Sequence, residues 1–236
     1  MDTGNSVTEK PPSGSDFADS PSSAQMGIPE VSHLSTCRLP TEHGVFSLQA
    51  FRVGQVASEI IALVKGDLSA ASPTPPLVRL HSQCLTGDVL GSRRCDCGEQ
   101  LQASLAAIAA DGRGILLYLP QEGRGIGLLN KLQAYSLQDQ GLNTIQANLA
   151  LGLPVDAREY RSAAALLLHL GLVRIRLMTN NPEKCRQLEE NGVQVIERVP
   201  IVVPANAFNQ GYMQTKADLM GHDLQLDLTH GIRTDS

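Results

Sequence analysis

Three of the five cysteines in this chain lie close together in the sequence, at Cys84, Cys95 and Cys97. Thiolates are soft ligands that suit zinc, and a site with three protein ligands leaves the fourth tetrahedral position open. A hydrolytic zinc needs that open position, because the metal lowers the pKa of a bound water molecule to about 7. The spacing alone also allows ordinary reduced cysteines or a structural zinc knot, since no second Cys-x-x-Cys pair completes a four-cysteine set. His81 is a candidate fourth ligand and equally a candidate core residue.

A glycine-rich stretch, Gly123-x-Gly125-x-Gly127, follows the continuous apolar run 115–119 and precedes a helical pattern. Glycines at such a turn let the backbone approach a ligand, and the N-terminus of the helix favours an anion. The spacing matches neither a phosphate-binding Walker A loop nor a dinucleotide fingerprint. On its own it does not separate a binding loop from a plain turn.

Four more side chains have types that could do chemistry, and each also has a structural interpretation. Asp156 and Arg158 stand two residues apart, as in many solvated ion pairs and helix caps. Tyr135 lies on the apolar face of a predicted helix, where a core aromatic is common. Thr179 ends a predicted strand and Lys184 lies in the first turn of the next helix, the place where α/β sheets bind ligands but also where caps and solvated charges occur.

The composition restricts the class of protein. The chain has 236 residues, 42% of them hydrophobic but only 3% aromatic, which allows a mainly aliphatic core. A net charge of −5 argues against a general nucleic-acid partner but not against a nucleotide, which needs only a few local cations. No long apolar run and no secretory signal are evident, so we expect no membrane partner. Five cysteines without a disulfide pattern fit a cytoplasmic location.

The hydrophobic periodicity predicts an α/β fold with helices flanking a sheet. Alternating or continuous apolar runs mark the strands, and apolar residues at helical spacing mark the helices. The segment from 67 to 76 is rich in Ser and Pro and is predicted to be a loop. The predicted strands are 41–51, 59–65, 77–81, 115–119, 173–177 and 193–199, and the predicted helices are 100–111, a helix around 128–135, 160–171 and 182–191.

The domain boundaries follow from composition. Residues 1–36 contain eight Ser, four Pro and three Gly, too few apolar groups to offset the entropy of ordering, so we expect a disordered tail. Its acidic residues and lack of Arg disfavour a transit peptide. The folded domain is predicted to span 37–228, with a frayed tail at 229–236.

Several of these motifs together resemble the enzyme GTP cyclohydrolase II, which opens the imidazole ring of GTP in the first step of riboflavin synthesis. The segments 81–88 and 94–98 resemble its zinc-binding segment. The similarity continues in Glu-Gly-Arg-Gly-Ile-Gly at 122–127, Asp-x-Arg at 156–158, Thr-Asn-Asn-Pro-x-Lys at 179–184 and a C-terminal stretch at 212–222. It covers roughly residues 37–222.

This resemblance implies a fold, a reaction and a set of site residues. The fold would be a mixed sheet with flanking helices, in a homodimer, and the reaction would convert GTP into a diaminopyrimidine ribotide, formate and pyrophosphate. One zinc would be bound by Cys84, Cys95 and Cys97, and Mg²⁺ would accompany the triphosphate. Asp156 would accept a proton, Arg158 would react at phosphorus and Tyr135 would assist catalysis. The implied nucleotide-binding residues are Arg79, Leu80, His81, Ser82, Gln83, Gln100, Glu122, Gly123, Arg124, Thr144, Thr179 and Lys184.

The chain also departs from the family pattern in ways that keep other hypotheses open. Gln83 and Gln146 stand where glutamates are usual, and Asn143 replaces a common aspartate, so each removes a negative charge that we expect near the site and could alter the zinc environment. The alternatives are a diverged enzyme that stops at the formylamino intermediate, a nucleotide-binding regulatory paralog and a structural zinc protein. For Arg158, electrostatic stabilisation of phosphate is physically easier than nucleophilic attack.

A synthase of riboflavin precursors is sometimes fused to this family. The predicted tail of 36 residues is too short and too polar for that domain, so we expect a monofunctional chain.

Overall fold

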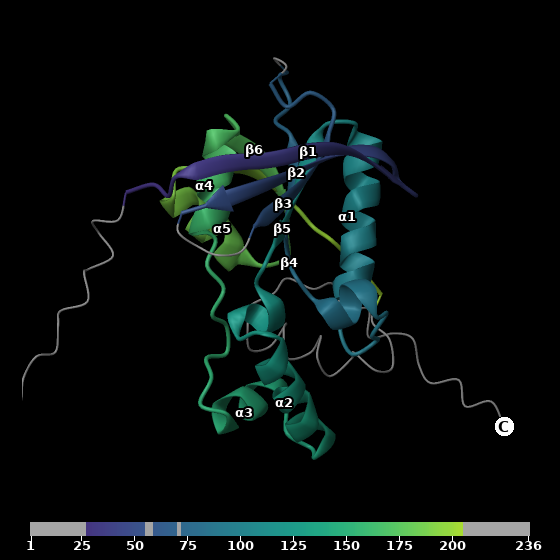
Figure 1. Ribbon diagram of the computed structural model, residues 1–236, viewed down its shortest axis with the longest axis vertical. Coiled ribbons are helices and arrows are strands. Elements are labelled where there is room, and N and C mark those ends of the chain that lie inside the picture. The colour runs from purple at the N-terminus through teal and green to yellow at the C-terminus, as the bar shows by residue number, and fades with distance from the viewer. Residues whose placement is uncertain (1–26, 55–58, 70–71, 205–236) are drawn as a thin grey trace, which may run out of the picture.

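A seven-stranded mixed sheet forms the centre of the molecule in the computed structural model, which describes residues 27–54, 59–69 and 72–204 (Figure 1). The spatial order of the strands is β1-β2-β3-β5-β4-β6-β7. The predicted α/β architecture is therefore confirmed. The strands are β1 (Val31–Thr41), β2 (Gly44–Val53), β3 (Ile60–Lys65), β4 (Leu77–Ser82), β5 (Gly114–Leu119), β6 (Arg174–Met178) and β7 (Gln194–Val199).

The sheet has an antiparallel part and a parallel part. Strands β1, β2, β3 and β5 pair antiparallel in that order, whereas β5, β4, β6 and β7 pair parallel to one another. Strands β5 and β4, in the middle of the sheet, are buried on both faces, which explains why β5 is a continuous apolar run. Because parallel strands end at the same edge of a sheet, the residues after β4, β5 and β6 gather there.

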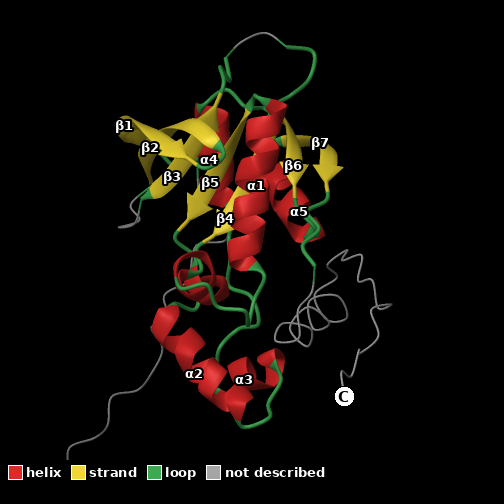
Figure 2. Cartoon of the chain, turned by 90° about the vertical axis from the view of Figure 1, so that its right-hand side faces the viewer, coloured by secondary structure: helices red, strands yellow, loops and turns green. Residues whose placement is uncertain are grey.

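Helices cover both faces of this sheet (Figures 1 and 2). Helix α1 (Cys97–Asp111) packs Leu105 and Ile108 on one face, and α4 (Arg161–His169) packs a fully buried stripe on the other. Helix α5 (Pro182–Glu190) lies on the same face as α4 and buries Leu188. The sheet core is therefore divided into two apolar clusters, one under each helical layer.

Strand β4 shows how this division positions polar groups. Its side chains alternate, so Val78 and Leu80 enter the cluster beneath α4. The residues between them and after them, Arg79 and His81, therefore point to the opposite face, where both are buried. The strand thus supports the core with one set of side chains and presents polar groups with the other.

A smaller helical lobe lies beyond the carboxyl ends of the parallel strands (Figure 2). It consists of α2 (Leu128–Asp139) and α3 (Thr144–Ala150). Two short turns join this region to the sheet: η2 (Leu85–Val89), a single π-helical turn after β4, and η3 (Glu122–Gly125), a 3₁₀ turn after β5. Both turns follow parallel strands, so they approach the lobe from the same edge.

Two predicted boundaries were wrong at the N-terminal end of the sheet. Strand β1 begins at Val31, so residues 31–36 form part of an edge strand and not of a disordered tail. Their side chains are mostly exposed, and they are ordered by backbone pairing with β2, which leaves no hydrophobic signal in the sequence. The predicted strand 41–51 begins in a hairpin turn formed by Glu42 and His43, and only its part from Gly44, which takes a φ of 99°, belongs to strand β2.

Other predictions lie outside the described residues. These are the order of the tail at 1–26, the C-terminal stretch 212–222 and the frayed end at 229–236. The loop predicted at 67–76 connects β3 to β4, as expected, with residues 70–71 outside the description.

Replacing Leu80 by Ala should destabilise the fold by about 2–5 kcal/mol, because its side chain is fully buried in the core. Urea unfolding of the nucleotide-free protein measures this change. Leu34→Ala is the control, since Leu34 is 42% exposed on the edge strand and should change the free energy of unfolding by less than about 1 kcal/mol. Equal effects of the two substitutions would contradict this placement of Leu80.

Candidate active site

A cavity with an empty volume of about 1150 Å³, part of it open to solvent, lies where the sheet meets the α2–α3 lobe. Among the described residues that line it, Glu122 is the one carboxylate, whereas six are cationic. A chain with a net charge of −5 therefore concentrates positive charge at one place, which favours a polyanionic ligand. The cations are Arg79, Arg94, Arg124, Lys131, Arg158 and Lys184.

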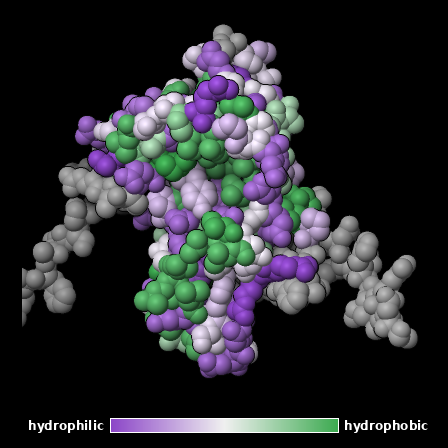
Figure 3. Space-filling view, turned by 45° about the vertical axis from the view of Figure 1, so that its right-hand side comes forward, coloured by the Kyte–Doolittle hydropathy of each residue, from purple (hydrophilic) through white to green (hydrophobic). Residues whose placement is uncertain are grey.

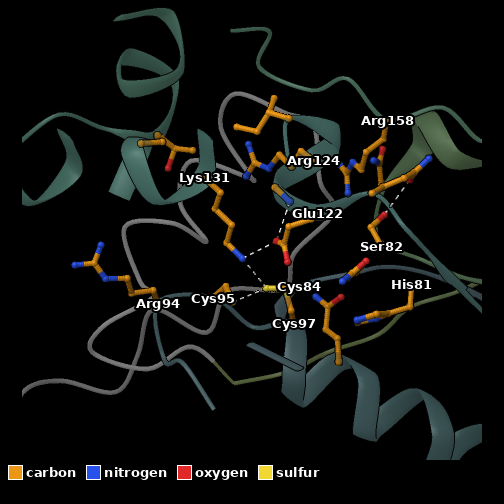
Figure 4. Close-up of a pocket in the computed structure, with 18 of the residues that line it drawn as sticks. His81, Ser82, Cys84, Arg94, Cys95, Cys97, Glu122, Arg124, Lys131 and Arg158 are labelled. Carbon is orange, nitrogen blue, oxygen red and sulfur yellow. Dashed lines mark hydrogen bonds and ion pairs between the residues drawn. The ribbon is translucent and has the colours of Figure 1, made fainter. Parts of the chain in front are cut away.

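Three thiols form a cluster at one end of this cavity (Figure 4). The sulfur atoms of Cys84, Cys95 and Cys97 lie within 4.8 Å of one another, and those of Cys84 and Cys95 are 3.7 Å apart. A tetrahedral zinc with Zn–S bonds of about 2.3 Å holds its sulfur ligands about 3.8 Å apart. Cys97 is also the first residue of α1, where the helix N-terminus favours a thiolate. The geometry therefore fits a zinc ion with three protein ligands.

The space around the cluster requires a glycine at position 87. A Cβ atom there would lie 2.9 Å from the sulfur of Cys95 and 3.2 Å from that of Cys84. The backbone N–H of Gly87 instead donates to the Cys84 sulfur at 3.4 Å. Turn η2 thus folds the chain around the three thiols and gives one of them a backbone hydrogen bond.

The thiols also share charge. Hydrogen bonds from Cys95 and Cys97 lower the pKa of Cys84, and Thr86 and Lys131 lower it further. The hydrogen bond to Cys84 raises the pKa of Cys95 to about 11. One thiolate held by neighbouring thiols is the state that a divalent cation converts into a set of thiolate ligands, by displacing protons.

The carboxylate of Asp88 orients the segment that carries Cys84. Its carboxylate accepts hydrogen bonds from the Cys84 backbone N–H at 3.0 Å, from Tyr118 Oη at 2.9 Å and from His81 Nε2 at 3.0 Å. His81 is therefore not a member of the thiol cluster but a partner of Asp88. Burial lowers the pKa of His81. Its Nδ1 atom is buried and has no hydrogen-bond partner within the described chain.

The glycine-rich turn η3 brings a distant segment to the cavity. Gly123 and Arg124 both adopt left-handed backbone conformations, with φ near 63° and 62°. A Cβ at Gly125 would lie 2.9 Å from the carbonyl oxygen of Ala157, and the Ala157 N–H donates to the Arg124 carbonyl at 3.0 Å. The close approach at Gly125 therefore holds the Asp-x-Arg segment beside the loop.

Within that segment, Asp156 and Arg158 form a two-point ion pair. Arg158 Nε donates to Asp156 Oδ1 at 2.8 Å, and its Nη2 contacts Oδ2. Burial alone would raise the pKa of Asp156, but the hydrogen bonds and charge of Arg158 outweigh it and lower the pKa. The carboxylate thus fixes the plane of the guanidinium, which lines the cavity.

Another wall of the cavity is formed by the end of β6 and the start of α5. Thr179 Oγ1 accepts from the Asn181 N–H at 3.0 Å, and Asn181 caps α5 through the Glu183 N–H. Lys184 Nζ donates to the Leu80 carbonyl at 2.8 Å. The Asn180 amide both donates to and accepts from the backbone of Ile201, which holds the chain after β7 against this wall.

Arg79 connects this wall to helix α1, which begins at Cys97. Its guanidinium donates to the Met178 carbonyl and to Gln100 Oε1, and Gln100 in turn donates to Asp96 at 2.5 Å. Burial lowers the pKa of Arg79 to about 10, and the charge of Asp96 partly opposes this. Its Nε has no partner within the described part of the chain.

Comparison with known proteins shows where this combination of motifs occurs. The family model described as GTP cyclohydrolase II matches residues 32–200. The chain belongs to the GTP cyclohydrolase II family. It is 53% identical over 192 residues to GTP cyclohydrolase-2 of Neisseria meningitidis serogroup B, which covers 81% of this chain and 96% of the relative. GTP cyclohydrolase-2 of Hahella chejuensis is also 53% identical, over 81% of this chain and 92% of its own length.

Longer and more distant proteins also match. The riboflavin biosynthesis protein RibBA of Bacillus cereus is 53% identical over 80% of this chain, but the match covers only 47% of RibBA. A solved structure of RibBX, a two-domain 3,4-dihydroxy-2-butanone 4-phosphate synthase from A. baumannii, gives a TM-score of 0.42 at 20% identity. It covers 73% of this chain and 40% of that chain, and a similarity this low supports no conclusion about either protein.

The cavity brings together nearly all the residues that the family resemblance implies, and two of them are placed differently. The Leu80 side chain lies in the core, and only its carbonyl reaches the site, through Lys184. Asp156 stands behind Arg158 and does not itself line the cavity. The residues that do line it are Cys84, Cys95, Cys97, Tyr135, Arg158, Arg79, His81, Ser82, Gln83, Gln100, Glu122, Gly123, Arg124, Thr144, Thr179 and Lys184.

Two of the three departures from the family pattern, Asn143 and Gln146, do not line the cavity. Asn143 and Gln146 are exposed and form a reciprocal capping box at the start of α3, with hydrogen bonds of 2.9 and 3.0 Å. Both amides serve the helix end, and the effect of the lost negative charges near the site stays a prediction. Gln83 does line the cavity.

Sequence reasoning missed Lys131, which lies at the metal end of the cavity (Figure 4). Its ammonium group donates to Cys84 Sγ at 3.1 Å and to Glu122 Oε1 at 2.8 Å. The apolar pattern pointed to Leu132, but that side chain is 46% exposed. The available signal was the spacing of four residues between Lys131 and Tyr135, which places both on one helix face.

Gly87→Ala should reduce the zinc content of the purified protein from one per chain to well below it, because the added methyl group would occupy the space of the thiols. Metal analysis by mass spectrometry measures the stoichiometry. Gly27→Ala is the control, since a Cβ there meets nothing within 4 Å. A Gly87→Ala protein with a full complement of zinc would show that this packing does not matter.

Proposed function

We propose that this protein hydrolyses GTP to 2,5-diamino-6-(5-phosphoribosylamino)pyrimidin-4(3H)-one, formate and pyrophosphate, with zinc as cofactor, as the first step of riboflavin biosynthesis. The observation that carries the proposal is the coexistence, in one cavity, of a three-thiol cluster and a set of cations suited to a triphosphate. The membership of the chain in the GTP cyclohydrolase II family supports the same reaction.

Zinc would be bound by Cys84, Cys95 and Cys97. When bound, it supplies Lewis-acid chemistry at neutral pH, which hydrolytic opening of the imidazole ring at C8 requires. Asp88 fixes the backbone of Cys84 and so the direction in which the thiols point. Tyr135 lines the cavity on the lobe side and can donate its phenol proton to a guanine or formyl oxygen.

The phosphates would bind against Arg124, Arg158 and Lys184, which line the cavity, and Mg²⁺ would accompany them and neutralise part of their charge. A guanidinium held at two points by Asp156 remains charged, and it presents its remaining N–H groups in a fixed plane. This arrangement supports electrostatic stabilisation of the departing pyrophosphate as the role of Arg158. The lowered pKa of Asp156 makes it a weak base and supports an orienting role.

Incubating the purified protein with GTP and Mg²⁺ tests the proposal, with formate and pyrophosphate assayed separately. We expect both products, and we expect Cys97→Ser to reduce formate release by at least about 100-fold, more than changes outside the ligand set cost. Cys37→Ser is the matched control, because Cys37 is exposed on the edge strand.

Each other pattern of products identifies a different protein. Pyrophosphate without formate indicates an enzyme that stops at the formylamino intermediate, and the neutral Gln83 in the cavity is then the first residue to change. Bound GTP without either product indicates a regulatory paralog. Full activity in protein that contains no zinc would overturn the metal-dependent reaction.

We propose that this chain forms a homodimer, in addition to binding GTP. Apolar side chains gather on the outer surface of the α2–α3 lobe (Figure 3), including Leu129 and Leu149, which are 71% and 63% exposed. Such a surface is commonly covered by another protein surface.

No helix in the described ranges is long and apolar enough to cross a membrane. We also propose a cytoplasmic location, because the thiols must stay reduced to bind zinc.

Leu129→Glu should shift the protein from dimer to monomer, because it places a charge in the apolar surface of the lobe. Size-exclusion chromatography with light scattering measures the mass in solution. Val173→Glu introduces the same charge at an exposed apolar position just before β6, outside the lobe, and should leave the dimer intact. A wild-type monomer, or a Leu129→Glu dimer, would refute this interface.

A further inference from the structure

Lys131 is buried at the point where three parts of the site meet. Its side chain is only 9% exposed, although it comes from a helix of the lobe. The ammonium group contacts Cys84 Sγ at 3.1 Å, Thr86 Oγ1 at 2.8 Å and Glu122 Oε1 at 2.8 Å (Figure 4). An ammonium group can stay charged when buried if its donors are all directed at acceptors. Here the acceptors belong to residues 84–86 and to turn η3.

The charges explain why a cation is needed at this place. Three thiolates around a divalent ion carry a net charge of −1, and the buried carboxylate of Glu122 adds another negative charge nearby. Charges removed from water need close compensation by opposite charges. Lys131 supplies one positive charge in contact with both a thiol ligand and the carboxylate.

Glu122 carries this connection further. Its second carboxylate oxygen accepts from the Leu85 N–H at 2.6 Å, at the start of the turn that folds around the thiols. The first oxygen also accepts from the Gly123 N–H at 2.9 Å. Lys131 and Glu122 together therefore join helix α2, turn η3 and turn η2.

We propose that Lys131 is a positioning residue of the metal site, which stabilises the three-thiolate set by charge and holds helix α2 against it. The inference rests on the proposed zinc site and adds a residue that the family's ligand set does not contain. Tyr135 lies one turn further along α2, and its ring centre is 5.6 Å from Lys131 Nζ. The position of Tyr135 therefore depends on the same contact.

A second cation strengthens the attachment of the lobe. The guanidinium of Arg94, next to Cys95, lies 5.0 Å from the centre of the Tyr135 ring and pairs with Asp139 near the end of α2. Exposed pairs of this kind contribute little stability by themselves. Lys131 is the buried member of the two contacts, so we expect it to dominate the coupling between metal and lobe.

A direct contact with phosphate is the competing role for Lys131, since it also lines the cavity. The two roles differ in what the substitution changes. Loss of a positioning residue lowers zinc affinity when no nucleotide is present. Loss of a phosphate ligand raises the KM for GTP and leaves zinc affinity unchanged.

The test measures zinc affinity of the full chain by competition with a chromophoric chelator, without GTP. Lys131→Met keeps the length of the side chain but removes the charge, and it should weaken zinc binding by about 10–100-fold. Lys131→Arg retains the charge and should recover most of the affinity. Gln133→Met, on the exposed side of the same helix, should bind zinc as the wild type does.

The outcomes separate this inference from the proposed function. Zinc binding by Lys131→Met that equals the wild type overturns the role of Lys131, and an increased KM for GTP then assigns it to phosphate. A wild-type protein that binds no zinc at all refutes the metal site itself. If Lys131→Met does not fold, Lys131→Gln repeats the measurement with a neutral side chain that can still donate to Glu122.

Discussion

The parallel pairing of β4 with β5 and β6 is the constraint on which the site depends. Because these strands run in one direction, the segments that leave them begin at one edge of the sheet. Turn η2, which folds around the thiols, follows β4. The glycine-rich turn η3 follows β5, and the Thr-Asn-Asn-Pro segment follows β6. Alternation along β4 then sends Leu80 into the core while Arg79 and His81 serve the cavity. The same hydrogen bonds that stabilise the sheet therefore set the spacing of the groups that line the cavity.

The two ends of the cavity are held by different physical means. Around the thiols, Lys131 compensates the buried charge of Glu122, and hydrogen bonds from the Cys84 N–H and Tyr118 satisfy the carboxylate of Asp88. Around Arg158, backbone conformation does the positioning, because Gly125 lets Ala157 approach and so brings Arg158 to the cavity. Charge networks respond to ions and neighbouring cations, whereas close backbone packing responds to volume. The two halves of the proposed reaction are therefore supported by interactions of different kinds.

The parallel half of the fold was readable from the sequence, since continuous apolar runs have few alternatives. The strands predicted at 77–81 and 115–119 are within one residue of β4 and β5. The edge strand β1 was not predicted, because its side chains are exposed and its order comes from pairing with β2. Helix α3 was not predicted either, as it is short and has only two buried residues.

The candidate site was predictable where a local motif carried it, and not where it depended on contacts between distant segments. The thiols stand close in sequence, so their spacing was informative. Lys131 meets Cys84 across 47 positions of the chain, and no local pattern encodes that contact. Asp88 likewise gains its role from His81 and from Tyr118, which belong to two different strands. Asp156 and Leu80 carried the right motifs, but only the three-dimensional packing shows that they act from behind the cavity wall.

The left-handed backbone of Arg124 has a further consequence. It is the one residue other than glycine with a positive φ in the described part of the chain, and such a conformation costs of order 1–3 kcal/mol. Glycine would relieve the strain, as it does at the neighbouring position 123. A protein selected for durability alone would gain by that exchange. A long cation that lines the cavity is thus kept in an unfavourable backbone conformation, so the proposed capture of phosphate by Arg124 would come at a cost in resistance to unfolding.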